Sequence, residues 1–187
     1  LTHLFTQHNR LGGDIGKYLD EKMMPALEDS LKIKNLDITP YVNVFNEVPE
    51  KGFSQFVDYP RYSTGYTTMW NTLGMMVETH MLKPYDKRVW GTYELMRSMV
   101  AITDNQSEKI KDLRAAENKK YLTKRWYPIH YKPDMEDPSI REFKGYEGEM
   151  IPSEVTGGER LKYDRSKAFT KDIEYFNNFV AEDRIDI

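Results

Sequence analysis

The first residue that could carry out chemistry is Glu78, a carboxylate in the middle of the short apolar run 74–82. Burying a carboxylate is costly unless a partner compensates its charge. One interpretation is a structural ion pair with Lys83, Arg61 or Arg88. The other is a general base held rigidly at the end of a strand, because a carboxylate can take a proton from an attacking water and release it again. The residues alone leave both interpretations open.

His80 lies two residues after Glu78, so on a strand it would share the face of that carboxylate. There it could tune Glu78 or contact a substrate, and a structural histidine with an ordinary hydrogen-bond partner is an equal alternative. The other histidines are His3, His8 and His130, and none of the four is followed three residues later by glutamate. We assign no metal ligand in this chain: nothing near His3 or His8 has ligand spacing, and polar or capping histidines in a loop are the favoured interpretation.

An aromatic, turn-rich segment precedes Glu78 and is typical of an ordered binding loop. Within it, Arg61 offers a bidentate fork for a carboxylate, with an ion pair to Glu78 or Asp58 as the alternative. The run Ser63 to Gly65 predicts a tight polar turn that could line a pocket. The next two large residues, Met69 and Trp70, are expected in the core.

The segment PRYSTGYTTMWNTLGMMVETHMLKPYDKRV (60–89) resembles zinc carboxypeptidases related to carboxypeptidase A, in a subgroup associated mainly with bacteria. The resemblance is strongest from Tyr59 to Tyr93, covers most of residues 1–120, and continues into the tail through PSEVTGGERLKYDRS (152–166). It implies an α/β fold in which this chain is the C-terminal half of a mixed-sheet domain with flanking helices, followed by a small β-rich region.

The resemblance also implies a site. Glu78 corresponds to the general base of the family, which acts on a zinc-bound water. The zinc ligands are a His-x-x-Glu pair and a later histidine, and we expect all of them upstream of Leu1. The candidate substrate-binding residues are Arg61, Tyr62, Ser63, Tyr66 and His80.

Two details of that site stay open. The family has a mobile tyrosine that closes over the terminal carboxylate of the substrate; Tyr59, Tyr62 and Tyr66 are candidates, and we favour Tyr62. Better-known members follow the catalytic glutamate with leucine, arginine and aspartate, whereas Thr79, His80 and Met81 follow it here. This difference leaves the base in place but gives no basis for carrying over a substrate preference.

We accordingly expect the parent protein to be a secreted or periplasmic zinc metallocarboxypeptidase that hydrolyses peptide or peptide-like amide bonds. Its partners would be a peptide substrate and the missing N-terminal part of the same protein, and this chain alone would be inactive. The alternative is a non-catalytic, peptidase-like module that binds a peptide or a partner protein through the aromatic loop.

The composition excludes several other classes of protein. A net charge of −3 over 187 residues implies no basic face, which argues against a nucleic-acid partner. The apolar runs are too short to span a bilayer, and the absence of cysteine excludes disulfides and thiolate metal sites. The aromatic content of 13% favours a packed structure. Because the chain opens and closes inside plausible elements, we expect both ends to be cuts through a longer polypeptide.

Hydrophobic periodicity predicts the elements that hold these residues. A helix is expected over 12–34, with the apolar stripe Ile15, Leu19, Met23, Leu27 and Leu31 and a kink or break at Pro25. We expect strands over 38–45 and 74–82, the latter buried, and a short helix near 67–73. A long helix should run from about Pro84 to Lys120, with a break near 103–107. The chain should then change to short strands, which predicts domains 1–121 and 122–187.

Overall fold

The computed structural model describes residues 1–42, 44 and 47–186 and divides into two compact units. Unit 1 consists of Leu1–Tyr41, Asp58–Ile129 and Asp183–Ile187, and unit 2 of Val42–Val57 and His130–Glu182. All the candidate site residues belong to unit 1. The expected domains 1–121 and 122–187 stay a prediction.

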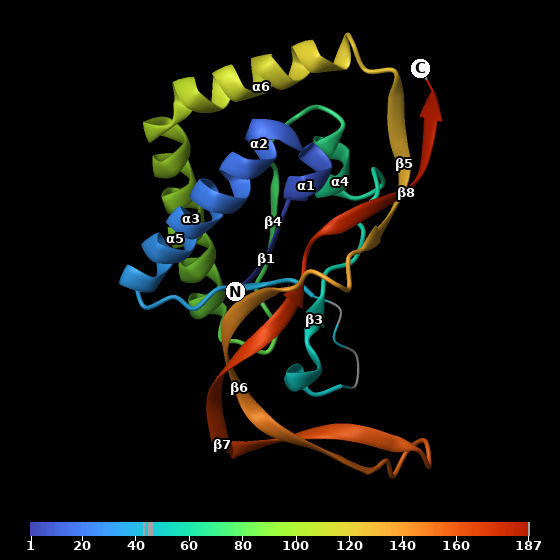
Figure 1. Cartoon of the computed structure of the whole chain (residues 1–187). Helices are drawn as coiled ribbons and strands as arrows, with labels where there is room; N and C mark the ends of the chain where they lie inside the picture. Colours follow the sequence, from blue (N-terminus) through green and yellow to red (C-terminus); the bar gives the residue numbers. More distant parts are fainter. Residues whose placement is uncertain (43, 45–46, 187) are drawn as a thin grey trace. The chain divides into compact units, whose positions relative to one another are not determined.

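Unit 1 begins with a strand and a run of helices. In chain order these are β1 (Thr2–Phe5), α1 (His8–Leu11), α2 (Gly13–Tyr18), the π-helical turn Leu19–Met23 and α3 (Met24–Ile33) (Figure 1). They are followed by β2 (Thr39–Pro40), α4 (Ser63–Thr68), β4 (Met75–Glu78), α5 (Tyr85–Asn105) and α6 (Ser107–Tyr121).

The expected helix over 12–34 is confirmed, and the irregularity at Pro25 is a π-helical turn rather than a break. Proline has no N–H to donate, and its ring collides with the carbonyl one turn earlier. The π-helical turn just before the proline accommodates the missing donor and the bulky ring. There the Met24 N–H donates to the Leu19 carbonyl, five residues earlier.

The π-helical turn also explains how a stripe with a strict spacing of four stays on one side. Four residues of a regular α-helix turn about 400°, so such a stripe drifts by roughly 40° at each step. The π-helical turn contains more residues than an α-helical turn, so it rotates the chain less per residue and offsets this drift. All five predicted stripe residues are buried: Ile15, Leu19, Met23, Leu27 and Leu31.

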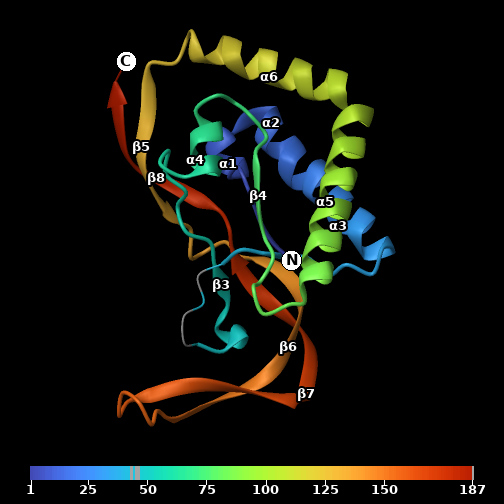
Figure 2. The same ribbon diagram turned by 180° about the vertical axis from the view of Figure 1, so that it is seen from behind.

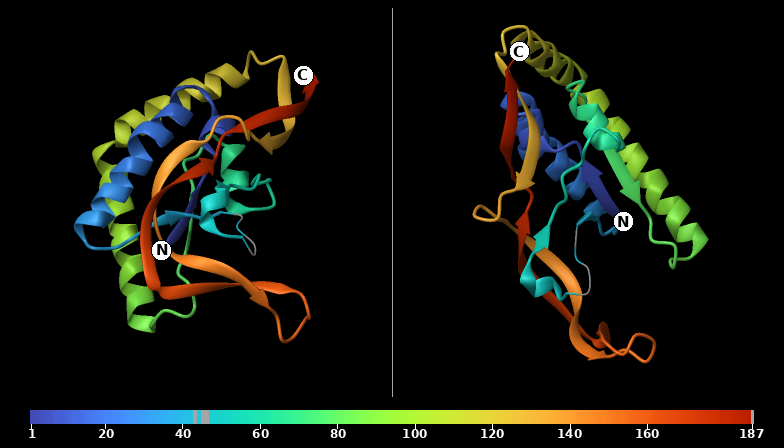
Figure 3. Two further views of the ribbon diagram at one scale, coloured as in Figure 1. Left: turned by 60° about the horizontal axis from the view of Figure 1, so that its bottom comes forward. Right: turned by 90° about the vertical axis from the view of Figure 1, so that its right-hand side faces the viewer.

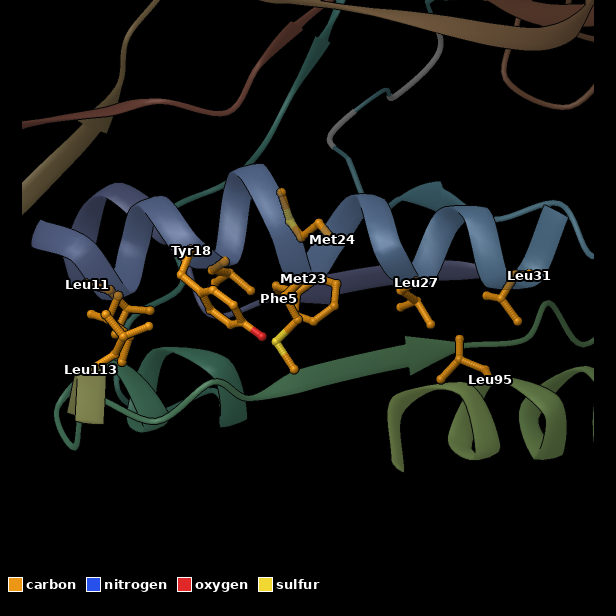
Figure 4. Packing of buried hydrophobic residues seen from close by; sticks show 11 residues of the cluster. Phe5, Leu11, Tyr18, Met23, Met24, Leu27, Leu31, Leu95 and Leu113 are labelled. Atoms are coloured by element: carbon orange, nitrogen blue, oxygen red, sulfur yellow. The ribbon is translucent and has the colours of Figure 1, made fainter. Parts of the chain in front are cut away.

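The stripe forms the centre of the main core of unit 1 (Figure 4). Phe5 of β1, Tyr18 and Met23 meet in its middle, while Leu95 of α5 lies against Leu27 and Leu31 at one end. At the other end, the core closes with Leu11 and with Leu113 of α6. Burying side chains of this size stabilises the fold by about 1.5–3 kcal/mol each.

The long helix predicted from Pro84 to Lys120 is confirmed together with its break. It is interrupted at Gln106, where α5 ends and α6 leaves in a new direction (Figure 2). Polar contacts tie α5 to α3: the buried Glu94 carboxylate lies 2.8 Å from Lys34 Nζ and 3.2 Å from Arg97 Nη1. The hydrogen bond from Lys34 lowers the pKa of Glu94.

The sheet of unit 1 has the strand order β2-β1-β4, with β1 parallel to β2 and antiparallel to β4. The expectation of a mixed α/β fold is therefore confirmed. Of the strand predicted over 38–45, Thr39–Pro40 forms β2, and residues 43 and 45–46 lie outside the described residues. The strand predicted over 74–82 is shorter, Met75–Glu78, and is half-buried with an exposed end rather than buried.

Unit 2 contains the β-rich region that the sequence predicts. The 3₁₀ turn Pro49–Lys51 leads into β3 (Phe53–Ser54), which lies parallel to β7 (Glu159–Phe176), and β7 pairs with β6 (Ser139–Pro152) in a long antiparallel hairpin (Figure 3). Its small core contains Phe53, Ile173 and Tyr175. The remaining strands, β5 (Trp126–Pro133) and β8 (Phe179–Asp186), form a two-stranded sheet, and each of them has residues in both units.

Candidate functional site

Glu78 is the last residue of β4, and its side chain is exposed. In the antiparallel ladder it lies directly opposite Thr2, whose hydroxyl is 3.4 Å from the Glu78 carbonyl oxygen. The chain then leaves the sheet in a turn. This places a carboxylate at an open strand end, as the sequence interpretation of a strand-end base requires.

The register decides on which face of the sheet the carboxylate lies. Residues directly opposite each other share a face, and neighbours along a strand alternate. Glu78 and Thr2 therefore lie on the face opposite to that of Phe5 and Val77, which pack in the helical core. His3 pairs with Val77 and so also lies on the core side, away from Glu78.

Glu78 makes no ion pair with any residue that the structure describes. The structural pairing with Lys83, Arg61 or Arg88 is therefore not formed here. An exposed carboxylate without a cation can approach a water or a ligand, and it pays no burial cost that would demand a partner.

His80 does not share the face of Glu78, because β4 ends at Glu78 and the chain turns. Its Nδ1 accepts a hydrogen bond from the Leu82 N–H at 3.2 Å, and its carbonyl accepts one from the Lys83 N–H at 3.1 Å. The imidazole thus stabilises the turn between β4 and α5, while its exposure leaves Nε2 accessible.

The run Ser63 to Gly65, expected as a polar turn, is in fact the first turn of α4, and the helix predicted near 67–73 ends at Thr68. Gly65 explains why this run is helical. An added Cβ there would meet the Asp58 carbonyl oxygen at 2.1 Å and the Tyr59 carbonyl oxygen at 2.3 Å. Only glycine lets α4 lie this close to the backbone of the preceding segment, and the helical backbone at this position brings the two segments together.

Arg61 and the aromatic residues around α4 form an exposed surface. Arg61 Nη2 donates to Tyr62 Oη at 2.9 Å, and its guanidinium lies 4.8 Å from the centre of the Tyr62 ring. The rings of Tyr66 and Trp70 lie 6.2 Å apart. The expectation that Met69 and Trp70 belong to the core is wrong, since both are about half exposed. Arg61 bonds neither Glu78 nor Asp58.

A threonine network fixes α4 to the start of β4. Thr6 Oγ1 lies 2.7 Å from Thr67 Oγ1 and accepts a hydrogen bond from the Gly74 N–H at 2.8 Å. Glu78 stands at the other end of β4, three residues beyond Met75, which is about 10 Å along the strand. The threonine network thus joins the end of α4 to the start of β4, while Glu78 lies at the far end of that strand.

The most unusual polar group of this region is the Asp58 carboxylate, whose burial no sequence pattern indicates. Asp58 is 1% exposed, and neither carboxylate oxygen makes a hydrogen bond of ordinary geometry with a described residue. Burial raises the pKa of this carboxyl, although the backbone N–H of Gly65 and the charge of Arg10 act in the opposite direction.

Backbone groups of Asp58 are well anchored. Its N–H donates to Gln7 Oε1 at 3.2 Å, and its carbonyl oxygen accepts from Arg10 Nη1, which also donates to Gln7 Oε1 at 2.8 Å. Gln7, just before α1, and Arg10 of α1 therefore hold the segment that leads into α4. No sequence pattern could have found this cluster, because its members are about 50 residues apart.

The described part of the chain contains no group of three histidine, aspartate or glutamate side chains placed to hold a metal ion. His3 is buried in β1, and His8 lies 4.0 Å from Asp20. These residues therefore do not fit a zinc site. Among the described helices, none is long and apolar enough to cross a membrane.

Comparison with family models, with curated proteins and with solved structures found no match to this chain.

Proposed function

We propose that this chain is part of the catalytic domain of a zinc metallocarboxypeptidase-like hydrolase, with Glu78 as the general base that acts on peptide or peptide-like amide bonds. The observation that carries the proposal is the placement of Glu78: a carboxylate at the exposed end of a sheet strand, without an ion pair among the described residues. The sequence resemblance over 60–89 supplies the reaction class.

In this role Glu78 takes a proton from the attacking water and then delivers it to the leaving amine. A carboxylate suits both steps because the same group must be a base first and an acid second. No group of metal-ligating side chains lies among the described residues, so the proposal assigns the zinc ion to ligands outside this chain. Secretion or a periplasmic location belongs to the same proposal.

Substrate binding would fall to Arg61, Tyr62, Ser63 and Tyr66. The Arg61 guanidinium is exposed and stacked on Tyr62, so it can still present donors to a carboxylate. Tyr62 flanks the start of α4 and can move without disturbing the core, which suits a residue that closes over a substrate. His80 lies two residues after the base, in the turn that follows β4.

The test replaces Glu78 with glutamine in the native, zinc-loaded polypeptide and measures release of C-terminal residues from peptides. We expect kcat to fall by about 10²–10⁴-fold with an unchanged melting temperature, because the side chain is exposed and unpaired. The matched control is Glu108→Gln, at a side chain that is 81% exposed on α6. Wild-type turnover in Glu78→Gln would contradict the proposal.

A second candidate function rests on a separate observation, the exposed aromatic surface of α4. A peptidase-like module without catalysis could bind a peptide through Tyr62, Tyr66 and Trp70, since aromatic side chains dominate binding surfaces. Titrating the 187-residue chain with peptides while following tryptophan fluorescence tests it. Binding that survives Glu78→Gln but is lost in Trp70→Ala, without turnover in the native polypeptide, would favour the module.

A further inference from the structure

Helix α5 presents a second apolar face, which is about half exposed or more and is not among the residues of the core clusters in the described part of the chain. Its members recur along the outer side of the helix and are between 49% and 73% exposed: Tyr85, Val89, Trp90, Tyr93, Met96 and Val100. In the right-hand view of Figure 3, α5 runs along the outer edge of unit 1. We call these six residues the outer face of α5.

Unit 1 does not need this face for its own core. The opposite side of α5 already packs inward: Leu95 is 1% exposed, Met99 and Ile102 border the core, and Gly91 lies against Leu1. A helix that is apolar on both sides is typical of one that is covered on both sides.

The area of the outer face is that of a protein interface. At about 150–250 Å² per aromatic side chain, its three aromatic residues alone expose roughly 350 Å². The aliphatic members, with the exposed Met81 and Leu82 just before α5, bring the total towards the ~800 Å² that each partner gives to a standard interface. This exceeds the largest apolar patch of a typical monomer, about 300–600 Å².

We propose that the outer face of α5 binds the same face of a second copy of this chain, with the two helices antiparallel about a two-fold axis. The members Val89, Tyr93, Met96 and Val100 have spacings of four, three and four, as in a coiled-coil seam. In an antiparallel pair, Val89 faces the partner's Val100 and Tyr93 faces the partner's Met96. The seam is therefore self-complementary in size.

Charge favours the antiparallel direction. The beginning of α5 and the turn before it carry Lys83, Lys87 and Arg88 against a single Asp86, whereas the last turn carries Asp104. The pairing that brings Val89 opposite the partner's Val100 also brings Asp104 level with the positive start of the partner helix. Antiparallel packing opposes the two helix dipoles as well.

One flank of the seam adds an aromatic contact. Trp90 and Arg97 are seven residues apart, so they project from the same side of the seam. In the antiparallel pair, Trp90 lies beside the partner's Arg97, and the two-fold axis repeats the contact. Arg97 already lies 5.7 Å from the Tyr93 ring centre, which holds its guanidinium at the edge of the seam.

Analytical ultracentrifugation of the 187-residue chain tests the proposal. We expect a dimer at micromolar concentration, with Val100→Asp weakening association by about 100-fold or more, because it buries an unpaired charge in the seam. The matched control is Val155→Asp, which changes a 93% exposed valine on the hairpin of unit 2. This variant should dimerise like the wild type. If the wild type stays monomeric up to about 100 µM, the proposal is overturned. The outer face of α5 would then be covered by another protein segment.

Cysteine cross-linking tests the direction, because the chain has no cysteine of its own. A mixture of Val89→Cys and Val100→Cys chains should form a mixed disulfide dimer. Neither variant alone should do so, since the two copies of either position lie 11 residues, or about 16 Å, apart along the axis. A disulfide dimer of Val100→Cys alone indicates a parallel pair, and a stable dimer that forms no mixed disulfide uses another face; either result overturns the proposal.

Discussion

Replacement of Gly65 by alanine should destabilise unit 1 strongly, although it adds a single methyl group. The new Cβ would lie 2.1 Å from the Asp58 carbonyl oxygen and 2.3 Å from the Tyr59 carbonyl oxygen. Such contacts are rarely shorter than 3.0 Å, so α4 or the 58–59 backbone must move by at least 3.0 − 2.1 = 0.9 Å.

That movement affects two hydrogen bonds, one from Arg10 to the Asp58 carbonyl and one of 2.9 Å from the Tyr62 N–H to the Tyr59 carbonyl. A neutral bond contributes about 0.5–1.5 kcal/mol and a charged one about 1.5–3 kcal/mol. Partial loss of both, together with overpacking, gives a cost of about 2–4 kcal/mol. At about 2–4 °C per kcal/mol, the melting temperature should fall by roughly 5–15 °C.

Thermal unfolding followed by circular dichroism measures this fall. The control is Gly158→Ala, whose Cβ would meet only Thr156 Oγ1, at 3.7 Å, and which should melt within about 1 °C of the wild type. If Gly65→Ala melts like Gly158→Ala, the close approach of α4 to the 58–59 backbone is not present in solution and the account of this region is wrong.

Two further predictions concern charges. Asp58→Asn should stabilise the chain at pH 7 by on the order of 1 kcal/mol, because it removes a buried charge whose folded pKa is raised above the ordinary value of 3.8. Below pH 3.8 the variant and the wild type should have the same free energy of unfolding. The advantage of the variant should grow as the pH rises to the folded pKa and stay constant above it. Urea unfolding across this pH range checks it, and an equal gain at pH 3 would contradict it. Asp172→Thr should raise stability by about 0.2–1 kcal/mol, because Asp172 lies directly opposite Glu142 in the β6–β7 ladder; a lower unfolding midpoint would show that this like-charge pair costs nothing.

The sequence predicted the elements whose apolar residues have only one way to be buried. The stripe from Ile15 to Leu31 was predicted residue by residue, since a long helix with one apolar side must pack that side inward. The irregularity at Pro25 was also predictable, because it follows from the missing N–H. Its form as a π-helical turn was not, because that depends on how the whole stripe meets the core.

Periodicity could not decide between two apolar faces of one helix. Val89, Tyr93, Met96 and Val100 show the clear helical spacing in α5, yet they lie outside, and Leu95 with its neighbours packs inward. A pattern indicates that a face is apolar but does not name what covers it.

For the candidate site, the apolar run predicts a strand that contains Glu78, but neither the end of β4 at Glu78 nor the surroundings of this residue could be predicted. The position of α4 depends on a glycine contact with the backbone six and seven residues earlier, and the Asp58 environment depends on α1. The glycine contact is close in sequence but has no recognisable pattern, and the Asp58 contacts join segments about 50 residues apart.

The pairing of β3 with β7 has a consequence for synthesis of the chain. Phe53 can pair in the sheet only after its neighbour Tyr175 has been synthesised, and Tyr175 follows 175 − 53 = 122 residues later. At about 5–20 residues per second, a ribosome needs roughly 6–24 s to supply that partner. During this time an apolar strand edge stays open to other nascent chains, whereas the helices before it can already collapse on one another. The growing polypeptide is thus most vulnerable to aggregation late in translation, and a chaperone that shields this segment would protect it more than one that acts on the helices.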